Sequence, residues 1–209
     1  MDANQDELSN PFGMDETCTN CALCEPRERV VHGYGDVGAD FLFVGEMPSA
    51  GAEETGVPFT GDAAGERLQD VLGRLELSES PPDAAEPELD NAFLTYLTRC
   101  RHPERPPADE EVGTCEPYLN AEIRMINPEI LVPVGQRALA EIAGEYTTTP
   151  AGEFDAAADH ATTVRGRGFE LVPMVHPAEQ TEEQTEAFVR HFSDLMGKDY
   201  RQTKGRQGR

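Results

Sequence analysis

The chain has 209 residues, which suits one compact domain whose hydrophobic core needs no disulfide bonds. Asp and Glu number 40 against 17 Lys and Arg, so the formal charge is −23, and this acidity argues against a surface that binds phosphates. The sequence shows no secretory signal pattern and no apolar run that could span a bilayer. We therefore expect a soluble, cytoplasmic protein with no membrane partner.

The acidity has two explanations. Proteins from salt-saturated cytoplasm carry acidic surfaces and few lysines, because multimolar salt screens the repulsion between carboxylates. Here the acidic residues are spread along the whole chain, and the only lysines are Lys198 and Lys204. The alternative is an acid-rich interaction protein. We favour the halophilic interpretation, under which net charge does not exclude a nucleic-acid partner.

Short apolar runs alternate with amphipathic helical patterns along the chain. Runs that are apolar throughout indicate a parallel sheet covered by helices on both faces. We expect an α/β fold with a four-stranded parallel sheet, in a single domain over 16–198 between a flexible N-terminus at 1–15 and a basic tail at 199–209. In chain order, the sequence predicts a strand at 39–45, a helix at 62–75, a loop at 78–90, a strand at 92–97, a helix at 109–126, a strand at 129–135, a helix at 136–143, a connector at 151–168, a strand at 169–176 and a helix at 182–196.

The expected sheet also indicates where a ligand would bind. Ligands of open parallel sheets lie at the carboxyl ends of the strands. This rule points to the segments that follow Gly45, Leu97 and His176, which lie at the ends of three of the expected strands.

The five cysteines favour metal or cluster ligation over disulfides, since their number is odd and no export signal is present. Cys18 and Cys21 form a Cys-x-x-Cys pair in a polar segment, and Cys100 and Cys115 form a wider pair. Two-plus-two thiolates hold either tetrahedral zinc or a [4Fe–4S] cluster, and scattered core cysteines are a further alternative. The wide second pair modestly favours the cluster. Cys24 either replaces Cys21 as a ligand or, as we favour, is a bystander thiol.

Several motifs follow one another in order, from about Cys18 to His191. Each motif is weak alone, but together they resemble the family 4 uracil-DNA glycosylases. The motifs are Cys18-x-x-Cys21-x-Leu23, Arg27, Gly33-Tyr-Gly35, 39–48 (ADFLFVGEMP), 56–65 (GVPFTGDAAG), 98–103 (TRCRHP), 110–119 (EEVGTCEPYL), 128–135 (PEILVPVG) and 175–178 (VHPA).

The resemblance implies a three-layer α/β/α sandwich and a [4Fe–4S] cluster on Cys18, Cys21, Cys100 and Cys115. It implies a DNA base-excision repair enzyme that hydrolyses the N-glycosidic bond of uracil, or of another deaminated base, in DNA. We expect it to act as a monomer.

Excision requires the target base to be flipped out of its stack, at a cost of a few kcal/mol. An aromatic ring that stacks on the flipped base recovers about 1–3 kcal/mol, and Phe59 holds the position that the family uses for this purpose. The resemblance also assigns base-binding positions to Gly45, Met47 and Tyr96. The alternative for Phe59 is a core side chain after a turn.

Cleavage leaves negative charge on the uracil O2, and a donor aimed there is worth about 3–4 kcal/mol. His176 ends a strand and is followed by proline, so it is positioned to be that donor. Glu46, after the first expected strand, could deprotonate the attacking water or stabilise the cationic sugar. A structural histidine and a loop-capping carboxylate are the alternatives.

Three positions depart from the family pattern. Ser49 stands where the family has glycine, and its side chain would narrow the approach to the loop. Tyr96, four residues before Cys100, stands where the family has an asparagine that reads the uracil edge. An amide pairs with both an acceptor and a donor, whereas a phenol has one hydroxyl and more bulk. The segment 177–183 (PAEQTEE) is acidic where the family inserts a wedge into DNA.

Two functional classes remain open. Glu46, Phe59 and His176 together favour an active glycosylase, which is the class that we expect. Tyr96 favours a non-catalytic iron–sulfur protein of the same fold that binds DNA or a protein partner, because its bulk suits filling the base pocket. A structural-zinc protein of unrelated function is a third alternative.

The charge of −23 predicts that folding depends on salt. The screening length is about 30 Å at 0.01 M salt and about 3 Å at 1 M, so dilute buffer leaves the repulsion almost unscreened. We expect the melting temperature to fall as potassium chloride is lowered from molar to millimolar concentration. Calorimetry over this range measures the effect, and an unchanged melting temperature would argue against the halophilic interpretation.

Overall fold

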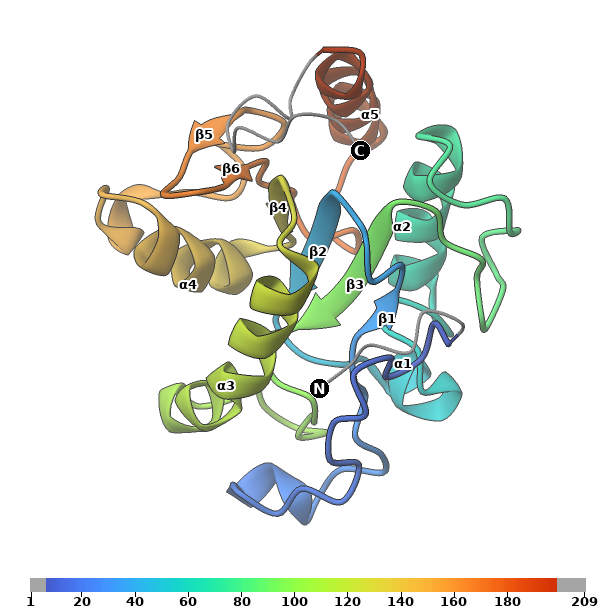
Figure 1. Cartoon of the computed structure of the whole chain (residues 1–209), viewed down its shortest axis with the longest axis vertical. Coiled ribbons are helices and arrows are strands. Elements are labelled where there is room, and N and C mark those ends of the chain that lie inside the picture. Colours follow the sequence, from blue (N-terminus) through green and yellow to red (C-terminus); the bar gives the residue numbers. More distant parts are fainter. Residues whose placement is uncertain (1–6, 199–209) are drawn as a thin grey trace.

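The computed structural model describes residues 7–198 of the chain. In chain order, its helices and strands are η1 (Ala22–Cys24), β1 (Tyr34–Gly35), β2 (Phe41–Gly45), α1 (Ala50–Thr55), α2 (Ala63–Arg74), β3 (Ala92–Tyr96), α3 (Asp109–Ile126), β4 (Ile130–Pro133), α4 (Gln136–Tyr146), η2 (Ala151–Glu153), β5 (Val164–Arg165), β6 (Glu170–Leu171) and α5 (Glu182–Met196). They form a six-stranded sheet in the order β1-β3-β2-β4-β6-β5, with helices on both faces (Figure 1). None of the helices within 7–198 has the length and apolarity needed to cross a membrane.

Four strands, β3, β2, β4 and β6, pair in parallel, as the sequence predicts. The sheet is wider than expected, because β1 and β5 add antiparallel edges of two residues each. Strands this short leave no alternating pattern in a sequence, so the sequence does not predict them. Strand β6 is also shorter than the expected strand at 169–176, although Met174 still bridges to Val134.

The sheet separates two hydrophobic layers, which confirms the α/β/α sandwich. Alternate residues of β2 point to opposite faces, so Phe41 and Phe43 belong to one layer and Leu42 and Val44 to the other. The first layer packs against α2 and α5, and the second against α3 and α4. The central strands are therefore buried on both faces, and their ends are the positions left for a ligand.

The helices begin and end close to the predicted residues. Helices α3 and α5 have the predicted bounds, and α4 continues beyond residue 143 to Tyr146. Helix α2 begins after Asp62, whose carboxylate accepts the Gly65 N–H at 2.8 Å. Helix α1 is not predicted, because the segment 50–55 (AGAEET) carries too few large apolar side chains for a helical pattern.

Residues 7–15 pack on the domain, although the sequence favours a flexible segment there. Phe12 and Met14 are buried in the layer of α3 and α4, and the Phe12 ring lies 5.9 Å from the Phe93 ring. The Asn10 side chain accepts the Met14 N–H at 2.8 Å and donates to the Met14 carbonyl at 3.0 Å. Two apolar side chains in a polar stretch are thus enough to attach the segment. Residues 1–6 and the expected basic tail at 199–209 lie outside the described residues.

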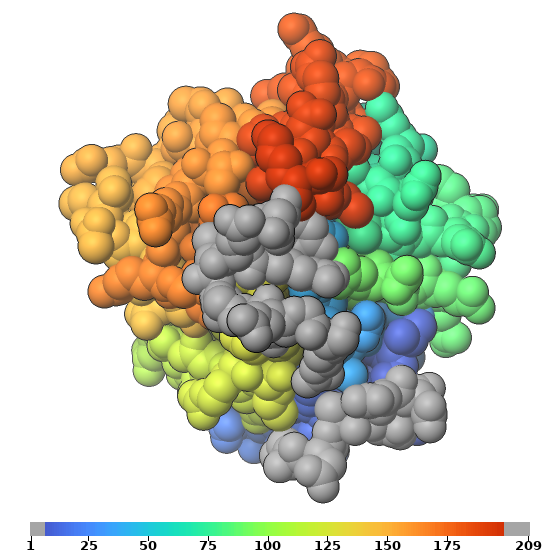
Figure 2. All heavy atoms as spheres, turned by 45° about the horizontal axis from the view of Figure 1, so that its top comes forward, coloured from blue at the N-terminus to red at the C-terminus, as the bar shows by residue number. Residues whose placement is uncertain are grey.

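Helix α5 closes one face of the sheet. It lies between the connector after α4 and the region of α2 (Figure 2). Two histidines fasten it to the connector: His160 Nε2 donates to the Gln184 carbonyl at 2.9 Å, and His191 Nε2 bonds with the Thr163 hydroxyl at 3.0 Å. The connector after α4 is therefore an integral part of the domain.

Candidate active site

Glu46 and His176, the two expected catalytic residues, line one cavity of about 480 Å³ at the carboxyl ends of the strands. Glu46 borders it directly after β2, and Arg137 borders it from the first turn of α4. His176 and Glu179 come from the loop between β6 and α5. The cavity therefore lies where parallel α/β sheets bind their ligands.

His176 is held as a neutral hydrogen-bond donor. Its Nδ1 accepts the Ala178 N–H at 3.3 Å, so the neutral ring carries its proton on Nε2. Burial lowers the pKa of His176 below its ordinary value, while the carboxylates of Glu179 and Asp62 act in the opposite direction. An N–H donor in a partly desolvated cavity can stabilise negative charge on a bound ligand.

The loop that carries His176 is fixed by two side chains. Arg67 of α2 donates from one guanidinium nitrogen to the carbonyls of Pro177 at 2.8 Å and Gln180 at 2.7 Å. The Gln180 amide in turn donates to the Val175 carbonyl at 2.6 Å. The sequence does not single out Arg67, because a lone arginine on an amphipathic helix carries no sign of its distant partners.

Glu46 is a carboxylate whose ionisation is altered by its surroundings. Burial raises the pKa of Glu46 above its ordinary value, and the Arg137 guanidinium partly offsets this rise. Arg137 is itself held by Asp109 at 2.8 Å and by Glu141 at 2.9 Å. A carboxylate with a raised pKa is a stronger proton acceptor than a fully solvated one, so Glu46 suits the role of general base.

Phe59 and Tyr96 pack against each other beside Gly45, with their ring planes tilted by 37°. Their ring centroids lie 4.7 Å apart, and the Phe59 N–H donates to the Tyr96 hydroxyl at 2.8 Å. A Cβ at Gly45 would come within 2.6 Å of the Phe59 ring and 2.8 Å of the Tyr96 ring, so a larger residue would disrupt the packing of the two rings. Burial raises the pKa of Tyr96 far above its ordinary value, and the hydroxyl is therefore neutral. Three of the expected base-binding residues are thus in contact, while the cavity of Glu46 and His176 is lined by others.

The backbone of Phe59 is strained. Its φ of +56° lies in the left-handed region, which costs a non-glycine residue about 1–3 kcal/mol. The Gln69 amide donates to the Phe59 carbonyl at 3.1 Å, and Tyr96 accepts the Phe59 N–H, so both sides of the residue are anchored. Strain that is fixed in this way is common at ligand-binding loops.

Met47 and Ser49, at the end of the motif that begins at residue 39, lie in the loop between β2 and α1. Met47 is partly buried there. The Ser49 hydroxyl accepts the Ala52 N–H at 3.1 Å and caps α1. The Ser49 side chain is thus engaged in a helix cap, a role that the sequence does not suggest.

Four of the five cysteines line a second, smaller cavity. Cys18 and Cys21 come from the N-terminal segment, Cys100 follows β3, and Cys115 lies in α3, whereas Cys24 does not line this cavity. All five are free thiols. Within 7–198, no group of three or more His, Cys, Asp or Glu side chains is close enough together to hold a metal ion.

Two N–H groups donate to these thiols. Arg27 donates from its guanidinium to Cys100 Sγ at 3.4 Å, and the Arg99 backbone N–H donates to Cys115 Sγ at 3.3 Å. Donors of this kind orient and stabilise sulfur ligands. The sequence singles out the cysteines but gives no sign of the buried Arg99 side chain, because arginine is normally a surface residue.

A model of the uracil DNA glycosylase superfamily matches residues 32–196. The chain belongs to the uracil DNA glycosylase superfamily. It is 31% identical over 176 residues to a type-4 uracil-DNA glycosylase of Sulfurisphaera tokodaii, covering 78% of this chain and 70% of that protein. It is 34% identical over 142 residues to a type-4 uracil-DNA glycosylase of Pyrobaculum aerophilum, covering 66% and 67%. A type-5 uracil-DNA glycosylase of Mycobacterium bovis is 35% identical over 161 residues, covering 73% and 59%. The resemblance drawn from the motifs is confirmed.

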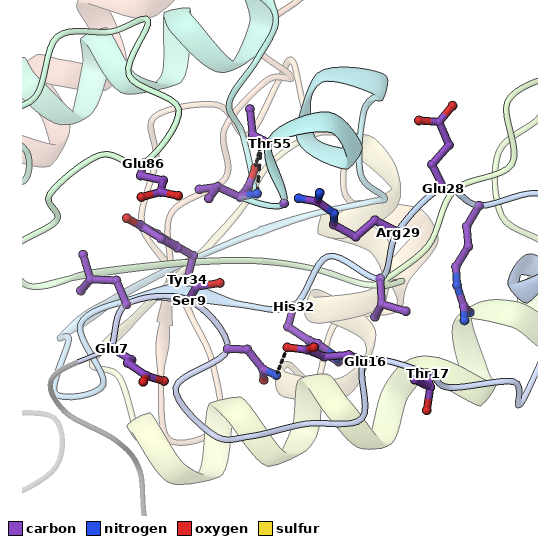
Figure 3. A pocket seen from close by; sticks show the side chains of 16 residues that line it. Glu7, Ser9, Glu16, Thr17, Glu28, Arg29, His32, Tyr34, Thr55 and Glu86 are labelled. Carbon is purple, nitrogen blue, oxygen red and sulfur yellow. Dashed lines mark hydrogen bonds between the residues drawn. The ribbon is translucent and has the colours of Figure 1, made fainter.

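This member of the superfamily also has a larger cavity, of about 940 Å³, on the side of the N-terminal segment. Figure 3 shows Arg29 and His32 among its lining side chains. Neither Glu46 nor His176 lines it, and its four glutamates outnumber its two arginines, Arg27 and Arg29, which disfavours a phosphate ligand. Its glutamates are Glu7, Glu16, Glu28 and Glu86.

The two cavity side chains should titrate away from their ordinary values. We expect the carboxyl of Glu46 to have a pKa above 4.5 and the imidazole of His176 a pKa below 6.5, with the His176 proton on Nε2 at neutral pH. Nuclear magnetic resonance titration of labelled protein measures both. Arg137→Gln should raise the pKa of Glu46 further, and Glu179→Gln should lower that of His176 further, because each removes an opposing charge. An Nδ1-protonated neutral ring would contradict the geometry.

Proposed function

We propose that this chain is a DNA base-excision repair glycosylase that hydrolyses the N-glycosidic bond of uracil, or of another deaminated base, acting as a monomer in the cytoplasm. The observation that carries the proposal is the cavity that Glu46 and His176 share. Membership of the superfamily and relatives named uracil-DNA glycosylases support the same reaction.

The two side chains supply complementary chemistry. As the glycosidic bond breaks, negative charge develops on the uracil O2, and the Nε2–H of a neutral His176 stabilises it by about 3–4 kcal/mol. Glu46, with its raised pKa, accepts a proton from the water that attacks the sugar carbon or stabilises the cationic sugar. The proposed roles therefore follow from the protonation state that each environment favours.

The alternative function, a non-catalytic protein, has support at the residues expected to recognise the base. Tyr96 is buried and packs against Phe59, the ring proposed to support the flipped base, and its hydroxyl already accepts the Phe59 N–H. A base can stack on Phe59 only if this arrangement leaves or makes room for it. If it does not, the chain is a non-catalytic iron–sulfur protein of the same fold that binds DNA or a protein partner.

We further propose that Cys18, Cys21, Cys100 and Cys115 hold a [4Fe–4S] cluster. The support is that these four thiols line one small cavity and that Cys24 does not. When bound, the cluster supplies iron–sulfur bonds that tie the N-terminal segment to the end of β3 and to α3. The donors on Arg27 and Arg99 suit thiolate ligands.

We infer that binding to DNA takes place at high salt. The formal charge of −23 repels a polyanion in dilute buffer. In molar salt the screening length falls to about 3 Å, so this repulsion no longer acts beyond close contact. Under these conditions, stacking and hydrogen bonding to the flipped base contribute the specificity that a basic surface does not. Halophilic adaptation would thus reconcile the acidic composition with a nucleic-acid substrate.

The cluster ligands can be separated from the bystander thiol by substitution. We expect Cys100→Ala to remove the brown colour and the iron and to lower the melting temperature, because one of four ligands is lost. The matched control, Cys24→Ala, should change neither, since Cys24 does not line the cavity. Visible absorption, iron analysis and calorimetry measure these effects. One zinc and no iron in the wild type would remove the cluster proposal, and a colour that needs Cys24 but not Cys21 would remove the ligand assignment.

Tyr96 decides between the two functions. We expect the wild type to be slow or inactive on uracil and Tyr96→Asn to gain activity, because an amide pairs with both polar groups of the uracil edge. The gain should disappear in Tyr96→Asn/His176→Ala. Cleavage of uracil-containing duplex and single-stranded oligonucleotides at high potassium chloride measures it.

Tyr96→Phe is the matched control for this gain. It removes the acceptor of the Phe59 N–H, as Tyr96→Asn also does, but it adds no amide, so it should gain nothing. A wild type that excises uracil rapidly, and loses that activity in Tyr96→Asn, would contradict the role given to Tyr96.

A further inference from the structure

Arg99 is a buried cation between the proposed base-binding residues and the cysteine cavity. Its side chain is 2% exposed, that of Glu122 is 1% exposed, and the two are joined at 2.6 Å. Taking such a pair out of water is costly, and apolar residues of similar size often serve stability equally well. Stability alone therefore does not account for the pair.

The guanidinium of Arg99 connects several parts of the fold. One terminal nitrogen donates to the carbonyl of Tyr96, the last residue of β3, and the other donates to the carboxylate of Glu122 in α3. Glu122 also accepts the Thr95 hydroxyl at 2.6 Å and the Gly33 N–H at 3.2 Å. The end of β3 is therefore held by one buried polar network.

Arg99 also borders the cavity of the four cysteines. It lines that cavity, and its backbone N–H donates to Cys115 Sγ at 3.3 Å. Its Nε is buried and has no hydrogen-bond partner among the residues that the structure describes. A buried N–H on a charged group needs an acceptor, and a sulfur-rich anionic group in the adjoining cavity would supply one.

We propose that Arg99 is a positioning residue that couples the four-cysteine site to the base-binding end of β3. Its unpartnered Nε–H would donate to the sulfur-rich group that the four cysteines would hold, while its terminal nitrogens hold the Tyr96 carbonyl and Glu122. The inference rests on the proposed cluster. It requires that one change in the guanidinium alters iron retention and base binding together.

Arg99→Lys tests this coupling, because lysine keeps the charge but loses the planar donor geometry of arginine. Arg74→Lys is the matched control, since Arg74 also forms an ion pair of 2.6 Å, with Glu186, but on the surface between α2 and α5. The proteins are purified anaerobically with their iron at high potassium chloride. Two quantities are measured: the rate at which EDTA removes iron, and the Kd for a duplex with one 2′-fluoro-2′-deoxyuridine, a probe that resists cleavage.

We expect Arg99→Lys to lose iron about 10-fold faster or more, and to bind the probe about 10-fold more weakly, while Arg74→Lys matches the wild type in both. If Arg99→Lys does not fold, Arg99→Met/Glu122→Gln, which removes both charges, carries the same expectation. Loss of only one property, or of neither, overturns the coupling. A wild type without iron overturns the cluster proposal itself, and this outcome is distinguishable because it involves no Arg99 variant.

Discussion

The parallel pairing of β2 with β3 on one side and β4 on the other is the constraint on which the site depends. The register sets Gly45 opposite Tyr96 and Val44 opposite Pro133. The carboxyl ends of β2, β3 and β4, which are far apart in the sequence, therefore lie side by side at one edge of the sheet. Glu46 is the first residue after β2 at this edge, and it therefore borders the same cavity as the first turn of α4. A shift of one residue in β2 would reverse which face each of its side chains points to.

Helix α2 fixes two loops near the site through polar side-chain contacts. Gln69 donates to the carbonyl of Phe59, and Arg67 donates to two carbonyls in the loop that carries His176. Both side chains belong to one helix that packs on the sheet through Leu68. Phe59 and the loop of His176 are consequently held in relation to each other by a single helix, as the preorganised site that we propose requires.

Local patterns account for what the sequence predicts. Apolar runs and helical periodicity mark the four parallel strands and the bounds of α3 and α5, and the motif order singles out the cysteines and the two residues of the cavity. The sequence does not predict three other features: the two-residue strands at the edges, the hydrogen bond from Phe59 to Tyr96, and the ion pair of Arg99 with Glu122. Each depends on partners distant in the sequence or on a residue type in an unusual environment, so no local sequence pattern predicts it.

The left-handed backbone of Phe59 has a consequence for how this position can vary. The conformation costs about 1–3 kcal/mol, and burying a phenylalanine ring contributes about 1.5–3 kcal/mol, so the two nearly cancel. Folding stability then gives little reason to prefer phenylalanine over a residue such as glycine that adopts this backbone without strain. In a laboratory library selected for heat tolerance alone, glycine would then be accepted at position 59, and an aromatic ring retained under any other selection would point to a role beyond folding.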